Sequence, residues 1–103
     1  MGKNSVIKSL ARVIGNVGFH KFLFEHTNQP EAKNHLRYEI IEYSADALEK
    51  TQEFNWNDND KIKIKEKSLE RAKNISENYP DLVFNWDEIE RIIEDFIEEL
   101  GLC

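Results

Sequence analysis

The chain has 103 residues, a formal net charge of −6, and 40% apolar residues that include two Trp and six Phe. This length and composition suit one domain with a single hydrophobic core, so one helical domain over residues 1–103 is expected. Only four Gly and two Pro occur while 33% of the residues are charged, which excludes fibrous and low-complexity chains and favours helices.

Apolar residues recur at helical spacing in four segments, which predicts an all-α fold, a small bundle of about four helices. The expected helices cover residues 5–24, 30–53, 58–78 and 86–100. In the first of them Gly15 and Gly18 each cost about 1 kcal/mol relative to Ala, and they are expected to bend or split the helix.

The next two segments have recognisable boundaries. Pro30 suits the first position of a helix, and Pro80 resists continuation of the preceding one. The expected buried stripe of the segment 30–53 is Leu36, Ile40, Tyr43 and Ala47. That of the segment 58–78 is Ile62, Leu69, Ala72, Ile75 and Tyr79.

The last segment carries end signals on both sides. Asn85 predicts an N-cap, with Glu88 three residues later completing a capping box. Gly101 predicts a left-handed residue after the helix, which lets Leu102 fold back on Ile97. The apolar stripe between these ends is expected to pack on the second and third helices.

Oxygen-bearing side chains alternate along the segment Asn55–Glu66. They stand at positions one, three, five and twelve of that segment: Asn55, Asn57, Asn59 and Glu66. In this spacing the segment resembles the loop of an EF-hand, which implies a divalent cation such as Ca²⁺ held by these oxygens. Asp60 stands where such a loop has glycine. The alternative is an asparagine-rich helix entrance, because Phe54-Asn55-Trp56 returns as the triplet at 84–86, where another helix is expected to begin.

Three histidines fall close together, at His20, His26 and His35. If the first two helices form an antiparallel hairpin, His20 and His35 approach one another, and Glu39 shares a helix face with His35. His20, His35 and Glu39 therefore resemble a two-histidine metal site. Surface histidines near a turn are the alternative.

Cations dominate the segment Lys61–Lys73, in which six basic residues stand against two acids and follow Trp56. This pattern indicates nucleic-acid binding as one alternative function. The other interpretation is that these lysines face the acidic last helix.

A protein partner is the favoured hypothesis. The first 24 residues carry four cations and no acid, and their aromatic residues exceed what one buried stripe requires. We expect some of these side chains to bind another protein or a second copy of the chain in a homodimer. The candidate contact residues are Phe19, Phe22, Phe24, Lys61, Lys63 and Lys65.

Enzymatic function is not predicted. No nucleophile elbow or phosphate-cradling glycine loop occurs, so we expect no catalytic residue, no cofactor and no small-molecule substrate. The single cysteine, Cys103, cannot form an internal disulfide, which indicates a reducing compartment, most simply the cytoplasm. Charges interrupt the apolar run 6–24 too often for a membrane span. The expected function is that of a non-enzymatic protein-interaction or structural module.

Overall fold

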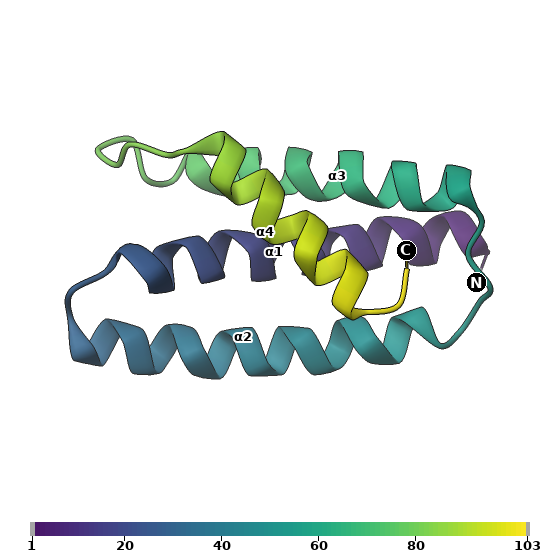
Figure 1. Ribbon diagram of the computed structural model, residues 1–103, viewed down its shortest axis with the longest axis horizontal. Helices are drawn as coiled ribbons and strands as arrows, with labels where there is room; N and C mark the ends of the chain where they lie inside the picture. Colours follow the sequence, from purple (N-terminus) through teal and green to yellow (C-terminus); the bar gives the residue numbers. More distant parts are fainter. Residues whose placement is uncertain (1, 103) are drawn as a thin grey trace.

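The computed structural model describes residues 2–102, which form four α-helices and no strand (Figure 1). The helices are α1 (Lys3–His26), α2 (Pro30–Thr51), α3 (Asp58–Ser76) and α4 (Trp86–Glu99). The prediction of an all-α bundle of four helices is confirmed. Among these residues, no helix has the length and apolar composition needed to cross a membrane.

The central helix is α1, because it packs against each of the other three. Figure 1 shows α2 and α3 on opposite sides of α1, with α4 crossing over it at an angle. α4 packs on α1 and α3, so the expectation that it packs on the second helix is wrong. Within residues 2–102, α1 is the only helix whose backbone lies close to α2.

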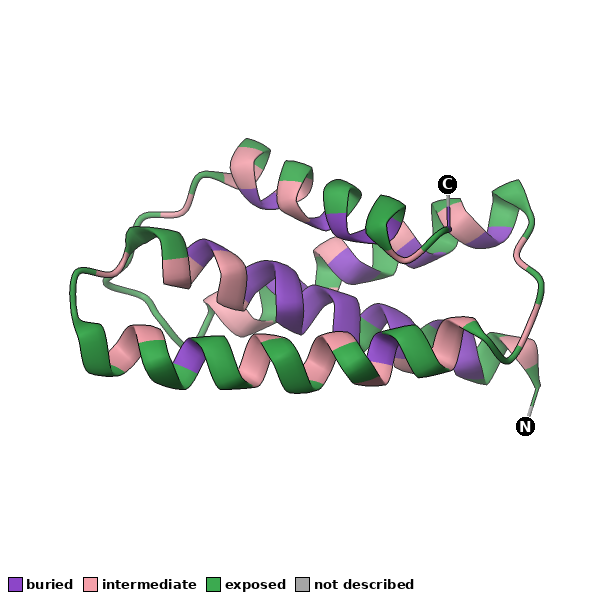
Figure 2. Ribbon diagram, turned by 60° about the horizontal axis from the view of Figure 1, so that its bottom comes forward, coloured by how far each residue is buried: buried purple, intermediate pink, exposed green. Residues whose placement is uncertain are grey.

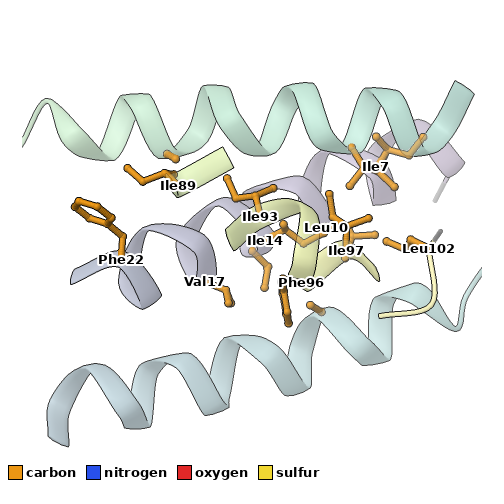
Figure 3. Close-up of a cluster of buried hydrophobic side chains, with 14 residues drawn as sticks. Ile7, Leu10, Ile14, Val17, Phe22, Ile89, Ile93, Phe96, Ile97 and Leu102 are labelled. Carbon is orange, nitrogen blue, oxygen red and sulfur yellow. The ribbon is translucent and has the colours of Figure 1, made fainter. Parts of the chain in front are cut away.

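The hydrophobic core is built mainly from α1 and α4 (Figure 3). Figure 2 shows that α1 is buried through most of its central turns, whereas α2 has few buried positions. Three neighbours cover α1, so it buries more than one stripe of its surface. Figure 3 labels ten of the core residues: Ile7, Leu10, Ile14, Val17, Phe22, Ile89, Ile93, Phe96, Ile97 and Leu102.

Two glycines allow the neighbouring helices to approach α1 closely. A Cβ atom at Gly15 would lie 2.7 Å from both the backbone oxygen of Ser68 and Cβ of Arg71 on α3. A Cβ atom at Gly18 would lie 2.5 Å from Cγ1 of Ile93 on α4. α1 nevertheless continues unbroken from Lys3 to His26. The prediction that the glycines split this helix is therefore wrong, because the packing that they permit offsets their low helix propensity.

The buried face of α3 differs from the predicted one. Ile64 and Ser68 are buried, whereas Ile62 and Tyr79 are exposed. Residues two positions apart point about 200° apart around a helix, so Ile62 and Ile64 cannot both face the core. Ala72 is buried as predicted.

The ends of α4 form through local hydrogen bonds. Asn85 Oδ1 accepts a hydrogen bond from the backbone N–H of Glu88 at 3.2 Å. The Glu88 carboxylate binds His26 on α1 and does not complete the predicted capping box. Gly101 has a φ of 78°. The backbone N–H of Leu102 donates to the carbonyl oxygen of Ile97 at 3.2 Å, which confirms the predicted helix end.

Candidate protein-binding surface

The asparagine-rich segment forms a helix entrance. Asn57 is the N-cap of α3, and its Oδ1 accepts from the backbone N–H of Asp60 at 2.8 Å. The Asp60 carboxylate accepts in return from the backbone N–H of Asn57 at 3.1 Å, which completes a capping box. Because α3 already begins at Asp58, Glu66 lies about 12 Å farther along the helix axis. Asn55, Asn57, Asn59 and Glu66 are therefore not arranged as an EF-hand loop.

The two Phe-Asn-Trp triplets are not equivalent in the structure. In the first copy the cap is Asn57, which follows the triplet, whereas in the second copy the cap is Asn85, its middle residue. The indole N–H of Trp56 donates to the carbonyl oxygen of Thr51 at 2.9 Å, which ties the entrance of α3 to the end of α2. Trp86 instead lies beneath the Lys73 ammonium, 5.9 Å from the ring centroid.

Lys3 on α1 reinforces the α3 entrance. Its ammonium group lies 2.5 Å from Oδ2 of Asp60. The hydrogen bond from Lys3, together with that from the backbone N–H of Asn57, lowers the pKa of Asp60. The buried Asp60 is thus explained by helix capping and an ion pair.

The α1–α2 hairpin brings His20 and His35 together, as predicted. Nε2 of each histidine lies 3.1 Å from a different carboxylate oxygen of Glu39. Burial lowers the pKa of His20, and the nearby Glu39 carboxylate opposes that shift. Among residues 2–102, no three histidine, cysteine or acidic side chains are placed to hold a metal ion. His26 is separate, because it binds Glu88 on α4.

The basic segment of α3 divides between two sides of the helix. Lys65 lies 3.2 Å from Glu90 and also pairs with Glu94, both on α4. The hydrogen bonds that the Lys65 ammonium donates to Glu94 and Glu90 raise the pKa of Lys65. Lys63 is exposed and Lys61 half-buried at the surface. Lys65 therefore offsets negative charge on α4 within the chain. This agrees with the interpretation that lysines of this segment face the acidic last helix.

The aromatic residues of α1 are distributed differently from the prediction. Phe19 and Phe22 are buried, with exposed fractions of 0% and 5%. The ring of Phe84 lies 5.3 Å from Phe19 and 5.9 Å from Phe22. Neither phenylalanine is therefore available to a partner of the folded chain. They are buried because α1 has neighbours on several sides.

Phe24 remains near the surface and is half-buried. The Lys33 ammonium and the Arg37 guanidinium, both on α2, lie 5.0 and 5.8 Å from its ring centroid. These cation–π contacts link the end of α1 to the first half of α2. Phe24 thus belongs to the edge of a surface that α2 dominates.

The outer face of α2 exposes a second apolar stripe that the sequence interpretation missed. Tyr38, Ile41 and Leu48 have exposed fractions of 73%, 60% and 48%, and Ala45 between them is also exposed. We call these four residues the outer stripe. The opposite face of the same helix carries Leu36 and Ala47, which are buried against the bundle. The signal was present in the sequence, since α2 has two apolar stripes and a core needs only one.

Protein-family models, curated proteins and solved structures yield no match to this chain.

A second apolar surface lies at one end of the bundle, between the α1–α2 turn and the α3–α4 loop. It surrounds an open hollow of about 480 Å³, to which both α1 and α2 contribute apolar residues. The loop contributes Leu82 and Val83, which are both exposed. These two residues lack the helical spacing of the outer stripe, so they do not define the shape of an occupant.

Proposed function

We propose that this chain is a non-enzymatic protein-interaction module that self-associates through the outer stripe of α2. The observation that carries the proposal is the exposure of Tyr38, Ile41 and Leu48 on a helix whose other face already packs on the bundle. Burying an exposed Ile or Leu side chain stabilises an assembly by about 1.5–3 kcal/mol. An ordered row of such residues along this 22-residue helix therefore favours association.

The spacing of the outer stripe suits a helical partner. Tyr38, Ile41, Ala45 and Leu48 follow one another at intervals of three, four and three residues. These are the intervals of the a and d positions of a coiled coil, which pack into the holes of a facing helix. Tyr38 and Ala45 then occupy a positions, and Ile41 and Leu48 occupy d positions.

Charge complementarity favours a second copy of α2, in parallel orientation. In this register Arg37 is a g residue and Glu42 an e residue, and a parallel pair places g of one helix beside e of the other. Arg37 of each copy would face Glu42 of the other, twice by two-fold symmetry. An antiparallel pair would instead bring the e rows together, which sets Glu42 and Glu49 against their own copies.

Glu42 and Arg37, which also lies over the ring of Phe24, can make such contacts. Within the described part of the chain, neither side chain takes part in an ion pair. Four acids of α4, by contrast, are already paired with residues of α1 or α3: Glu88, Glu90, Glu94 and Glu99. The opposed charges of the first and last helices are thus partly satisfied within one chain, and the dimer proposal depends on α2 instead.

Sedimentation equilibrium at high micromolar concentration tests this proposal. Wild-type protein should show a reversible monomer–dimer equilibrium, and Ile41→Asp should shift it to monomer. Ile62→Asp is a matched control, because Ile62 is similarly exposed but lies on α3. A monomer at every concentration, or equal effects of the two substitutions, would reject the outer stripe as the interface.

Charge reversal tests the parallel orientation. Arg37→Glu and Glu42→Arg should each weaken the dimer, and the double variant should restore it, because the reversed pair again has opposite charges. A double variant as weak as the single variants would exclude the parallel pairing.

For the location of the protein we propose the cytoplasm, supported by the single cysteine. Cys103 itself lies outside the described residues.

A further inference from the structure

A hollow between α1 and α3 is lined by four cations, in a chain that is otherwise acidic. Its volume is about 260 Å³, and its charged and polar lining residues are Lys8, Arg12, Lys67, Arg71, Glu70 and Asn74. The cations form two pairs with four-residue spacing, one pair on each helix, so the two members of a pair share one helix face. Both pairs line the same groove. With one acid among them, the groove has a net charge of +3 in a protein whose total is −6.

These four cations lack intramolecular partners of the kind that other lysines have. Lys3, Lys21, Lys50 and Lys65 each pair with an acid. Among residues 2–102, no acidic side chain forms an ion pair with any of the four cations of the groove. Gathering like charges in one hollow opposes folding, and an anion bound there would relieve the repulsion.

Arg71 is held in place by α1. Its Nε–H donates to Oδ1 of Asn16 at 3.1 Å, and Asn16 has an exposed fraction of only 8%. Gly15 makes this position possible, because a Cβ atom there would lie 2.7 Å from Cβ of Arg71. The bond to Asn16 uses one nitrogen of the guanidinium and leaves its two terminal NH₂ groups for an anion. A guanidinium fixed in this way loses less conformational freedom when it binds an anion.

We infer that this groove binds a phosphate-bearing anion. Guanidinium groups bind phosphate oxygens through two parallel hydrogen bonds, and lysine ammonium groups add charge without fixed direction. A net charge of +3 matches a ligand with several negative charges better than a single carboxylate. A polyphosphate and the backbone of a nucleic-acid strand share this chemistry. The site differs from the basic segment Lys61–Lys73, because it takes half of its cations from α1.

Binding of two probes to paired variants tests the inference. The probes are tripolyphosphate, followed by titration calorimetry, and a short fluorescein-labelled single-stranded oligonucleotide, followed by anisotropy. The variant Lys8→Gln/Lys67→Gln removes two charges from the groove. The control Lys61→Gln/Lys63→Gln removes the same charge from α3 outside it. We expect the groove variant to weaken binding by about tenfold or more and the control to change it by less than about twofold.

Each outcome decides the inference. Groove-dependent binding of tripolyphosphate alone supports a small phosphate ligand, and groove-dependent binding of the oligonucleotide supports a nucleic-acid strand. No binding of either probe, or equal losses in both double variants, overturns the inference.

A measurement without ligand gives a second test. Relief of the repulsion should raise the melting temperature of the groove variant above that of the control variant. If the groove variant melts at or below the temperature of the control, the four cations do not repel one another and the inference loses its electrostatic basis.

Discussion

Ile93 packs on α1 at the point where Gly18 has no side chain. A Cβ atom at Gly18 would lie 2.5 Å from Cγ1 and 3.2 Å from Cδ1 of Ile93, and real Cβ atoms essentially never approach another atom within 3.0 Å. Ile93 is fully buried within the hydrophobic core. This pair of residues therefore sets how closely α4 crosses α1.

Gly18→Ala should destabilise the protein although Ala is the better helix former. Ala gains about 1 kcal/mol of helix propensity, but the added methyl group forces Ile93 out of its position, at a cost of about 1–3 kcal/mol for overpacking. Urea denaturation of the wild type and the variant measures the net loss. In an Ile93→Ala background the clash is absent, so there Gly18→Ala should be neutral or stabilising. A stabilising effect of Gly18→Ala in the wild type would contradict the close approach.

Ile93→Ala alone should lower the free energy of unfolding by about 2–5 kcal/mol, because it removes a fully buried side chain and leaves a cavity. Ile92→Ala is a suitable control, since Ile92 is only partly buried at the edge of the core. Chemical denaturation should give a smaller loss for the control. A loss below about 0.5 kcal/mol for Ile93→Ala would mean that this stripe of α4 is not core.

The entrance of α3 should respond to loss of its cap and not to calcium. Asn57→Ala removes the acceptor for the Asp60 backbone N–H and should cost about 0.5–2 kcal/mol. Asn59→Ala, two residues into the helix, should change stability by less than about 0.5 kcal/mol. Millimolar calcium should leave the melting temperature and the tryptophan fluorescence unchanged, because a ligand of the native state would raise stability by mass action. A saturable calcium effect abolished by Glu66→Gln would revive the EF-hand interpretation.

His20 should titrate below pH 6.5, its ordinary value, because burial lowers its pKa in the folded state. Protonation of His20 then favours the unfolded chain. The contribution of neutral His20 to the free energy of unfolding is therefore fully present above pH 6.5. It is lost as the pH falls from 6.5 through the folded-state pKa. NMR titration of the ring protons measures the midpoint directly. Glu39→Gln should lower the His20 midpoint further, because the carboxylate opposes the effect of burial. A wild-type midpoint above pH 6.5 would show that the carboxylate outweighs burial.

The extent of each helix was predictable because local residues mark the ends. Pro30 and Asn85 at the starts, and Gly101 beyond the last helix, act through backbone geometry that a sequence displays directly. The approach of His20 to His35 followed from the short connection between the first two helices. Which helices pack on one another was not predictable in this way, because the sequence of one helix does not show how many neighbours it has.

The same limit explains the errors at the candidate sites. Phe19 and Phe22 looked like surplus apolar surface because α1 was expected to bury a single stripe, and its central position buries several. Ile62 and Ile64 are equally apolar, and only the direction of approach of α1 decides which one is buried. The groove around Arg71 joins two helices that are far apart in the sequence, so no local pattern could have indicated it.

Among residues 2–102, α1 is the only helix whose backbone packs on α2, whereas α3 packs on both α1 and α4. Detaching α2 therefore breaks one helix–helix interface, and detaching α3 breaks two. Local opening reactions begin at the least supported element of a fold. Backbone amides of α2 should therefore exchange with solvent deuterium by a smaller opening than those of α1. Contact between two outer stripes would give this helix a second supporting neighbour, so that association and the ordering of α2 strengthen each other.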